Sequence, residues 1–108
     1  MTINEYQQLA LVTMNKENTG DRMLTNGVMG LCGEAGECVD MVKKYLFQGH
    51  SLDKEKLLKE LGDVAWYLAV TAAALDTPLE DVLAANIEKL KKRYPDGFSA
   101  ERSVNRDE

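Results

Sequence analysis

Two pairs of acidic residues have the types and the spacing for metal chemistry. Glu34 and Glu37 form one pair, and Glu60 and Asp63 form the other. Residues three positions apart lie on neighbouring turns of one face of a helix. Carboxylate oxygens are hard ligands, so four of them brought together would suit Mg²⁺, with Mn²⁺ as a substitute.

Convergence of these carboxylates would be costly without a cation. Two like charges about 5 Å apart repel each other by roughly 3 kcal/mol at an effective dielectric constant of 20. A bound divalent ion removes that repulsion. The spacing therefore leaves two interpretations open, which are a cation site and ordinary solvated charges on helix surfaces.

The remaining residue types argue against several other chemistries. The single histidine, His50, falls in an expected turn, so neither a Glu-x-x-His di-iron site nor a zinc site with two histidines fits. Cys32 and Cys38 are six residues apart in an expected helix, which does not suit a disulfide. We expect two buried thiols in a reducing, cytoplasmic compartment.

Four helices are expected to position the acidic pairs, in an all-α, four-helix bundle. Apolar periodicity and capping signals place them at about residues 3–16, 22–47, 53–75 and 78–93, with Thr77 capping the last. A short turn joins the second and third helices, which favours antiparallel packing. The two acidic pairs lie on the same side of their helices' apolar stripes, so in that arrangement they would face each other.

The composition is that of one domain that associates with copies of itself. The chain has 108 residues, 44% of them hydrophobic, and we expect one domain over residues 1–98 and a polar tail over 99–108. The segment from Val64 to Leu75 has no charged residue on any face. A helix of that kind must be covered all round. We therefore expect a homodimer or a homotetramer built as a dimer of dimers.

The charge and hydropathy of the chain exclude two classes of partner. The net charge of −5 argues against a nucleic-acid polymer as the main partner. No apolar run approaches the roughly 18 residues of a membrane-spanning helix, and no leader pattern begins the chain. We expect a soluble protein with no membrane partner.

Glycines recur inside the expected helix at 22–47, at positions 27, 30, 33 and 36. Each glycine in a helix interior costs about 1 kcal/mol relative to alanine. Close approach of a neighbouring helix or of a ligand would offset this cost. Local distortion of the helix is the competing explanation.

Three stretches of the sequence resemble the MazG-like nucleotide pyrophosphohydrolases. They are GLCGEAGECVDMVKK at 30–44, KELGDVAWYLA at 59–69 and ANIEKLKKRYPDGFS at 85–99. They occur in this order with compatible spacing, and the likeness extends over most of the chain.

The acidic pairs coincide with the signature of that family, which is Glu-Glu-x-x-Glu followed by Glu-x-x-Asp. Glu34 and Glu37 match the second and third glutamates of the signature, and Glu60 and Asp63 match the closing pair. Gly33 stands where the first glutamate would be. The resemblance is therefore to a short, single-domain subgroup whose metal site has one carboxylate fewer.

The resemblance implies a bundle of the all-α NTP pyrophosphatase type and a specific reaction. A nucleoside triphosphate (NTP or dNTP) would be hydrolysed between its α- and β-phosphates to the monophosphate and pyrophosphate. Mg²⁺ would bind the phosphate oxygens and lower the pKa of the attacking water. Glu34, Glu37, Glu60 and Asp63 would be the catalytic metal ligands, with Glu37 as the candidate to orient or deprotonate the water. An enzyme for diphosphates or modified nucleotides would keep the same site.

Four further residues are candidates for binding the substrate: Lys43, Asn86, Lys89 and Arg93. Asn86 falls inside an apolar stripe, so it either contacts the substrate or sets the register between helices. The three cationic residues either contact phosphates or are solvated charges near helix ends.

The alternative function is a non-catalytic helical module that dimerises through the uncharged segment and binds a protein partner. This alternative predicts that Mg²⁺ does not affect stability. A ligand that binds only the native state must raise the melting temperature, so a thermal scan separates the two hypotheses.

Overall fold

Residues 1–106, which the structure describes, fold into five helices and contain no β-strand. In the computed structural model the helices are α1 (Ile3–Val12), α2 (Gly20–Phe47), α3 (Lys54–Ala74), α4 (Leu79–Arg93) and α5 (Ala100–Val104). The all-α class expected from the sequence is confirmed. The short helix α5 falls in the expected polar tail, whose last two positions, 107 and 108, lie outside the described residues. None of the described helices is long and apolar enough to cross a membrane.

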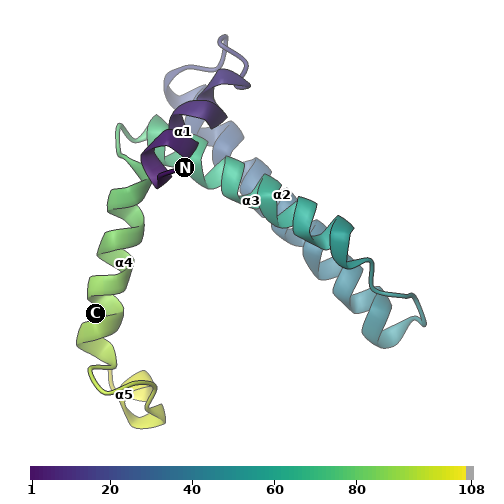
Figure 1. Ribbon diagram of the computed structural model, residues 1–108, viewed down its shortest axis with the longest axis vertical. Helices are drawn as coiled ribbons and strands as arrows, with labels where there is room; N and C mark the ends of the chain where they lie inside the picture. The colour runs from purple at the N-terminus through teal and green to yellow at the C-terminus, as the bar shows by residue number, and fades with distance from the viewer. Residues whose placement is uncertain (107–108) are drawn as a thin grey trace.

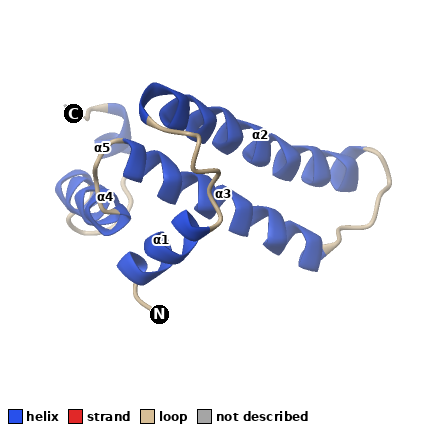
Figure 2. Ribbon diagram, turned by 90° about the horizontal axis from the view of Figure 1, so that it is seen from above, coloured by secondary structure: helices blue, strands red, loops and turns tan. Residues whose placement is uncertain are grey.

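The helices form two arms that diverge from a junction (Figure 1). Helices α2 and α3 pack against each other as an antiparallel hairpin, which is the first arm. Helices α4 and α5 make the second arm, and α1 lies at the junction against α3 and α4 (Figure 2). The four long helices that the sequence predicts are all present, but within one chain α4 leads away from the hairpin instead of lying along it.

Two hydrogen bonds explain why α1 ends at Val12 and not near residue 16. The Thr13 hydroxyl donates to the Ala10 carbonyl oxygen at 2.9 Å, and the indole N–H of Trp66 donates to the same oxygen at 3.0 Å. The carbonyl that would continue the helix is therefore already occupied. At the other end of α1 the Thr2 hydroxyl accepts a hydrogen bond from the Glu5 backbone, as the capping pattern predicts.

A buried glutamine, and not the expected Thr77 cap, fixes the start of α4. The residue at the cap position is Pro78, and no side chain of the capping residue bonds to the helix. The Gln7 side chain from α1 replaces it: its Oε1 accepts from the Leu79 N–H at 2.9 Å, and its Nε2 donates to the carbonyls of Thr77 at 3.2 Å and Ala69 at 3.0 Å. One buried amide thus ties together α1, α3 and α4, which sets the direction in which α4 leaves the junction.

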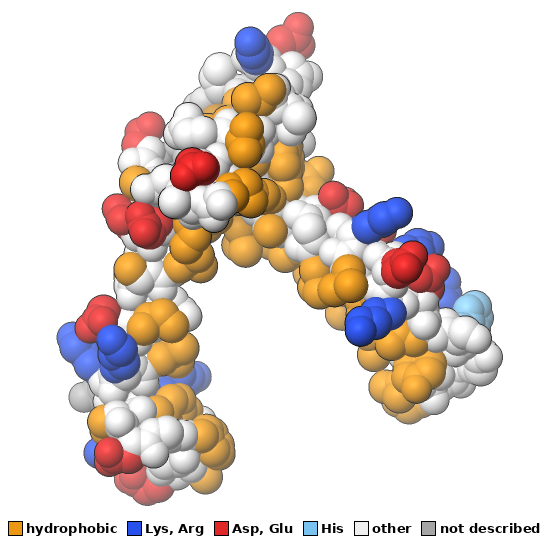
Figure 3. All heavy atoms as spheres, viewed as in Figure 1, with side chains coloured by type: hydrophobic (Ala, Val, Ile, Leu, Met, Phe, Trp, Pro, Cys, Tyr) orange, Lys and Arg blue, Asp and Glu red, His pale blue; other side chains and the backbone are white. Residues whose placement is uncertain are grey.

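The hydrophobic core of the single chain is small and lies at the junction. Its buried hydrophobic residues are Ala10, Ala69, Val70, Ala72 and Leu79. Tyr6 and Trp66 pack against this group as partly buried side chains. Much of the apolar surface of the arms stays exposed, and it gathers on the sides of the two arms that face each other (Figure 3).

Two of the four glycines inside α2 that the sequence singled out allow close packing against α3. A Cβ atom at Gly27 would clash with Thr71, and one at Gly30 would clash with the ring of Tyr67. These two positions confirm the expectation that a neighbouring helix approaches closely. The tight contact holds α2 and α3 in the register on which the acidic residues depend.

Candidate metal centre

The hairpin brings carboxylates from α2 and α3 together. Glu34 and Glu37 come from α2, and Glu60 comes from α3. Each of the three can offer one oxygen such that all three oxygens lie within 4.8 Å of one another. Three of the four acidic residues singled out in the sequence therefore meet at one point between the two helices.

The fourth acidic residue, Asp63, lies near this group but outside it. It is one turn beyond Glu60 on α3, and its negative charge contributes to raising the pKa of Glu37. Its oxygens are not among those that meet within 4.8 Å. Asp63 is thus placed at the edge of the cluster, on the side toward the junction of the arms.

The electrostatics of the cluster are those of acidic groups held together without compensation. The pKa of Glu37 is raised, mainly because its protonated carboxyl can hydrogen-bond to Glu60 and because the charge of Glu60 repels a second negative charge. One side-chain oxygen of Glu34 and one of Glu60 are buried and make no hydrogen bond. Buried polar atoms normally have partners, so these two oxygens are suited to serve as ligands of a cation.

An open cavity of about 470 Å³ adjoins the cluster, which is a volume within the range of small-molecule sites. It is lined by Gly33, Gly36, Glu37, Asp40, Met41, Lys56 and Glu60. A Cβ atom at Gly33 or Gly36 would meet nothing within 4 Å. These two glycines therefore do not serve helix packing within the chain, and they leave one wall of the cavity open.

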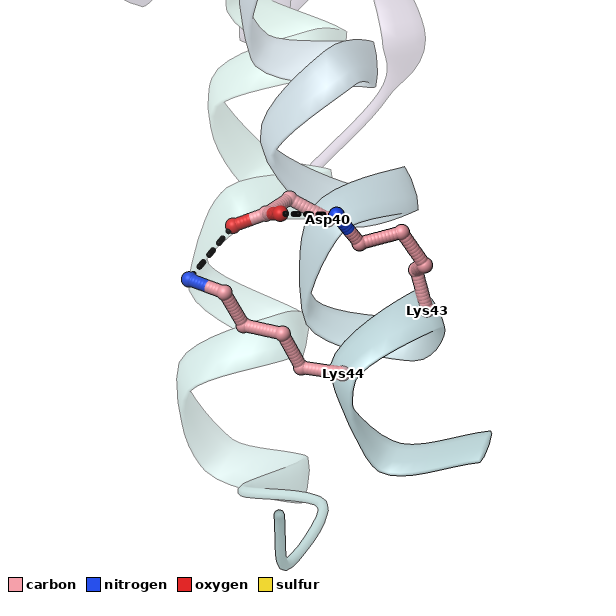
Figure 4. A network of polar contacts seen from close by, with 3 residues as sticks. All are labelled: Asp40, Lys43 and Lys44. Atoms are coloured by element: carbon pink, nitrogen blue, oxygen red, sulfur yellow. Dashed lines mark ion pairs between the residues drawn. The ribbon is translucent and has the colours of Figure 1, made fainter. Parts of the chain in front are cut away.

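The candidate basic residues are not gathered at the cluster. Lys43 pairs with Asp40 at 3.5 Å, and Lys44 pairs with the same carboxylate at 2.8 Å (Figure 4). Neither of these two lysines lines the 470 Å³ cavity. Lys43 is the one that the sequence suggested as a substrate-binding residue.

The three candidates on α4 lie in the other arm of the molecule (Figure 1). Asn86 and Lys89 are exposed there, and the Arg93 guanidinium lies 5.7 Å from the centre of the Tyr94 ring. Within one chain they do not join the carboxylate cluster.

Sequence reasoning missed one cation at the cavity, which is Lys56. It lines the cavity together with Glu37 and Glu60. Its position four residues before Glu60 on α3 was the available signal, because residues four apart share a helix face.

These features define a class of protein: an all-α chain in which a helical hairpin holds carboxylates, beside an open cavity, in a set that fits a hard divalent cation. Residues 24–98 match the family model of the MazG nucleotide pyrophosphohydrolase domain. The chain belongs to this family, whose members generally depend on divalent metals. The resemblance seen in the sequence is thereby confirmed.

Two curated proteins are similar to the chain. The Gene 37 protein of Mycobacterium phage L5 is 36% identical over 114 residues, which cover 98% of this chain and 100% of that protein. The uncharacterized protein YvdC of Bacillus subtilis (strain 168) is 34% identical over 73 residues, which cover 59% of this chain and 69% of YvdC. No solved structure matches the chain.

Proposed function

We propose that the protein hydrolyses nucleoside triphosphates to the monophosphate and pyrophosphate in a Mg²⁺-dependent reaction. The observation that carries the proposal is the meeting of Glu34, Glu37 and Glu60 within 4.8 Å, with two of their oxygens buried and unpartnered, in a chain of the MazG family. When bound, the divalent cation would supply charge neutralisation of the phosphates and an acidified water.

The roles of the protein's own residues follow from their places in the hairpin. Glu34 and Glu60, each with a buried unpartnered oxygen, would hold the cation, and Asp63 at the edge of the cluster would bind it from the junction side. Glu37 is more exposed than Glu34 and Glu60, and it lines the cavity. It is therefore the carboxylate best placed to orient a water or accept its proton. Its pKa is raised mainly by the hydrogen bond with Glu60 and by the negative charge of Glu60.

A panel of the common NTPs and dNTPs with Mg²⁺, with pyrophosphate release as the readout, tests the proposal. We expect release from at least one of them, and its loss on chelation of the metal. Folded protein that releases no pyrophosphate from any of them would refute the hydrolysis of these nucleotides and leave two hypotheses, an enzyme for diphosphates or modified nucleotides and the protein-interaction module.

A matched pair of variants tests the metal site itself. Glu60→Gln keeps the shape of the side chain and removes one ligand charge, and Glu55→Gln makes the same exchange five residues earlier on α3, outside the cavity lining. We expect Glu60→Gln to reduce turnover by more than about 100-fold, since even partners of metal ligands are worth 10–100-fold. Glu55→Gln should stay within about two-fold of the parent. Equal activity of the two variants would remove Glu60 from the site.

We further propose that the working form is a homodimer or a dimer of dimers. The chain exposes 7989 Å², whereas a compact monomer of 12.0 kDa would expose about 6,000 Å². The radius of gyration is 16.9 Å, against about 13 Å for a compact domain of this length. An excess of about 2,000 Å² per chain matches what obligate homodimers bury.

The distribution of the exposed apolar side chains supports the same proposal. Val82, Leu83 and Ile87 on α4 are 44%, 40% and 50% exposed, and they share one face of that helix at spacings of one, four and five residues. A second copy that covers this face would also give α4 a helix to pack against. Light scattering at micromolar concentration should report at least a dimer, and Leu83→Glu should shift the protein to monomer. A monomeric parent protein would refute this part of the proposal.

The cysteines and the net charge are consistent with a cytoplasmic enzyme that acts on a small phosphate substrate. Cys32 and Cys38 are free thiols, which fits the reducing conditions of a cytoplasm, but the expected burial is wrong: Cys32 is exposed and Cys38 is only partly buried. The net charge of −5 disfavours a nucleic-acid polymer and is compatible with a small phosphate ligand that binds together with a cation.

A further inference from the structure

A second open cavity adjoins the carboxylate cavity on the side of the turn between α2 and α3. Its volume is about 260 Å³, and Lys44, His50, Ser51, Leu52 and Asp53 line it. Asp40, Met41 and Lys56 line both cavities. The two cavities therefore adjoin along these three side chains, and together they form a trough that begins at Glu37 and Glu60 and ends at the turn.

The charges along the trough change from acidic at the cluster to two acidic and two basic side chains at the turn, which are Asp40, Asp53, Lys44 and Lys56. Asp40 is neutralised by Lys44 at 2.8 Å and Lys43 at 3.5 Å, and the hydrogen bond from Lys44 is the main reason why the pKa of Asp40 is lowered (Figure 4). The Asp53 carboxylate accepts a hydrogen bond from the Lys56 backbone N–H at 3.0 Å, as the cap of α3. Both acidic groups of the second cavity are thus already engaged.

Lys56 is the cation of the trough whose charge is not used by the protein. The ion pairs found among residues 1–106 do not include its ammonium group. Lys56 lies four residues before Glu60 on α3, which corresponds to about 6 Å along the helix axis toward the turn. Its side chain lines the trough at the place where the carboxylate cavity passes into the cavity at the turn.

We propose that the cavity at the turn binds the terminal phosphates of the substrate and that Lys56 is the residue that binds them. This inference rests on the proposed function, because it assigns a direction to the substrate of that site. The polyphosphate tail lies along the trough toward His50, and the nucleoside lies on the opposite side of the carboxylate cluster. Lys56 then offsets the negative charge that develops on the pyrophosphate as it leaves.

The physical reason for this direction is the match between ligand charge and lining. A polyphosphate tail needs cationic donors, and Lys56 supplies the uncommitted one, with the Lys44 ammonium beside it. A nucleobase in the same place would leave the Lys56 charge without a partner and would gain little apolar contact, since Met41 and Leu52 are the only hydrophobic side chains in the lining of the second cavity.

Titration of pyrophosphate into the protein in the presence of Mg²⁺ tests the proposal without any turnover. We expect Lys56→Gln to weaken pyrophosphate binding by about 10- to 100-fold, which is the usual worth of a hydrogen bond between charged groups. Lys59→Gln, which removes the same charge one turn along α3 and outside the lining of both cavities, should stay within two-fold of the parent. A melting curve of each variant confirms that the fold is retained.

A second titration, with nucleoside monophosphate, tests the direction of the substrate. Lys56→Gln should leave this affinity unchanged, because the monophosphate does not extend into the trough toward the turn. Weaker binding of monophosphate with unchanged binding of pyrophosphate would reverse the assigned direction and overturn the proposal. Unchanged binding of both ligands, or a parent protein that binds no pyrophosphate, would overturn it as well.

The outcomes separate this inference from the proposed function. An active parent enzyme whose Lys56→Gln variant is fully active and binds pyrophosphate normally would sink only the role of Lys56. A parent that turns over no nucleotide but binds pyrophosphate in a Lys56-dependent manner would refute the hydrolase and retain the phosphate site.

Discussion

Replacing Gln7 with leucine should destabilise the protein far more than the same change at Gln8. Gln7 is 5% exposed and makes three hydrogen bonds to the backbone, one each to α3, to the α3–α4 connection and to the first residue of α4, whereas its neighbour Gln8 is exposed. Leucine fills a similar volume but offers neither a donor nor an acceptor. The variant therefore isolates the polar contribution of the side chain.

The size of the effect follows from which backbone groups lose their partners. The Leu79 N–H is buried at a helix start and loses its acceptor, which costs about 1–3 kcal/mol. The Thr77 carbonyl is partly buried, and loss of its bond adds about 0.5–1.5 kcal/mol. The Ala69 carbonyl lies inside α3, where the helix supplies another donor. We expect a loss of about 2–4 kcal/mol in the free energy of unfolding, or about 8–16 °C in Tm.

Urea denaturation followed by circular dichroism, at one fixed protein concentration, measures this difference. Amide hydrogen exchange provides a local readout, because the Leu79 amide should lose protection in Gln7→Leu. Gln8→Leu should change the free energy of unfolding by less than about 0.5 kcal/mol, as is usual at exposed positions. If Gln7→Leu is no less stable than Gln8→Leu, the buried amide does not tie α1 to α4 and the direction of α4 has another cause.

Three further predictions concern the metal site and the glycines of α2. Mg²⁺ at 100 times its Kd should stabilise the parent protein by about 2.7 kcal/mol. Thermal scans should show this gain in Glu55→Gln and not in Glu60→Gln. A gain that is retained in Glu60→Gln would exclude Glu60 as a metal ligand. NMR titration of the metal-free protein should give Glu37 a pKa above that of an ordinary glutamate, because Glu60 favours its protonated form. The contribution of the Glu37 carboxyl to stability is then complete below the ordinary pKa of glutamate and is lost as the pH rises through its raised pKa in the folded protein. Saturating Mg²⁺ should reverse the shift. An ordinary pKa of Glu37 without metal would contradict the clustering of the carboxylates. Gly30→Ala should lower the free energy of unfolding, because its Cβ meets an aromatic ring. Gly33→Ala, whose Cβ lies in open space, should raise the free energy of unfolding of the metal-free protein by about 1 kcal/mol in urea titrations. A more stable Gly30→Ala than Gly33→Ala would contradict the packing of the hairpin.

The sequence predicted the helices and the acidic cluster because both depend on local periodicity. The i, i+3 spacing on two helices joined by a short turn made a meeting of the carboxylates possible but left solvated surface charges as an equal alternative, and the structure brings Glu34, Glu37 and Glu60 together. Periodicity could not tell that Asp63 would lie at the edge, since this depends on how far the two helices are offset along their axes. That offset is set in part by the contact of Gly30 with an aromatic ring on α3.

The direction of α4 was beyond local reasoning. A pattern such as Thr77-Pro78 predicts where a helix starts. The hydrogen bonds that orient α4, however, come from Gln7, which lies seventy positions before Thr77. Nothing in the spacing of Asn86 or Lys89 reveals that they lie in a different arm from the carboxylates. Lys56, in contrast, was within reach, because its spacing from Glu60 placed it on the same face of α3.

The small core at the junction has a consequence for the life of the newly made chain. A polypeptide that buries so few of its own apolar side chains leaves the ribosome with exposed hydrophobic surface on both arms. Until those surfaces are covered, the chain is exposed to the same aggregation that threatens folding intermediates of larger proteins. Its yield in a cell should therefore depend on how rapidly it is synthesised and on chaperone capacity, as well as on the stability of the finished fold.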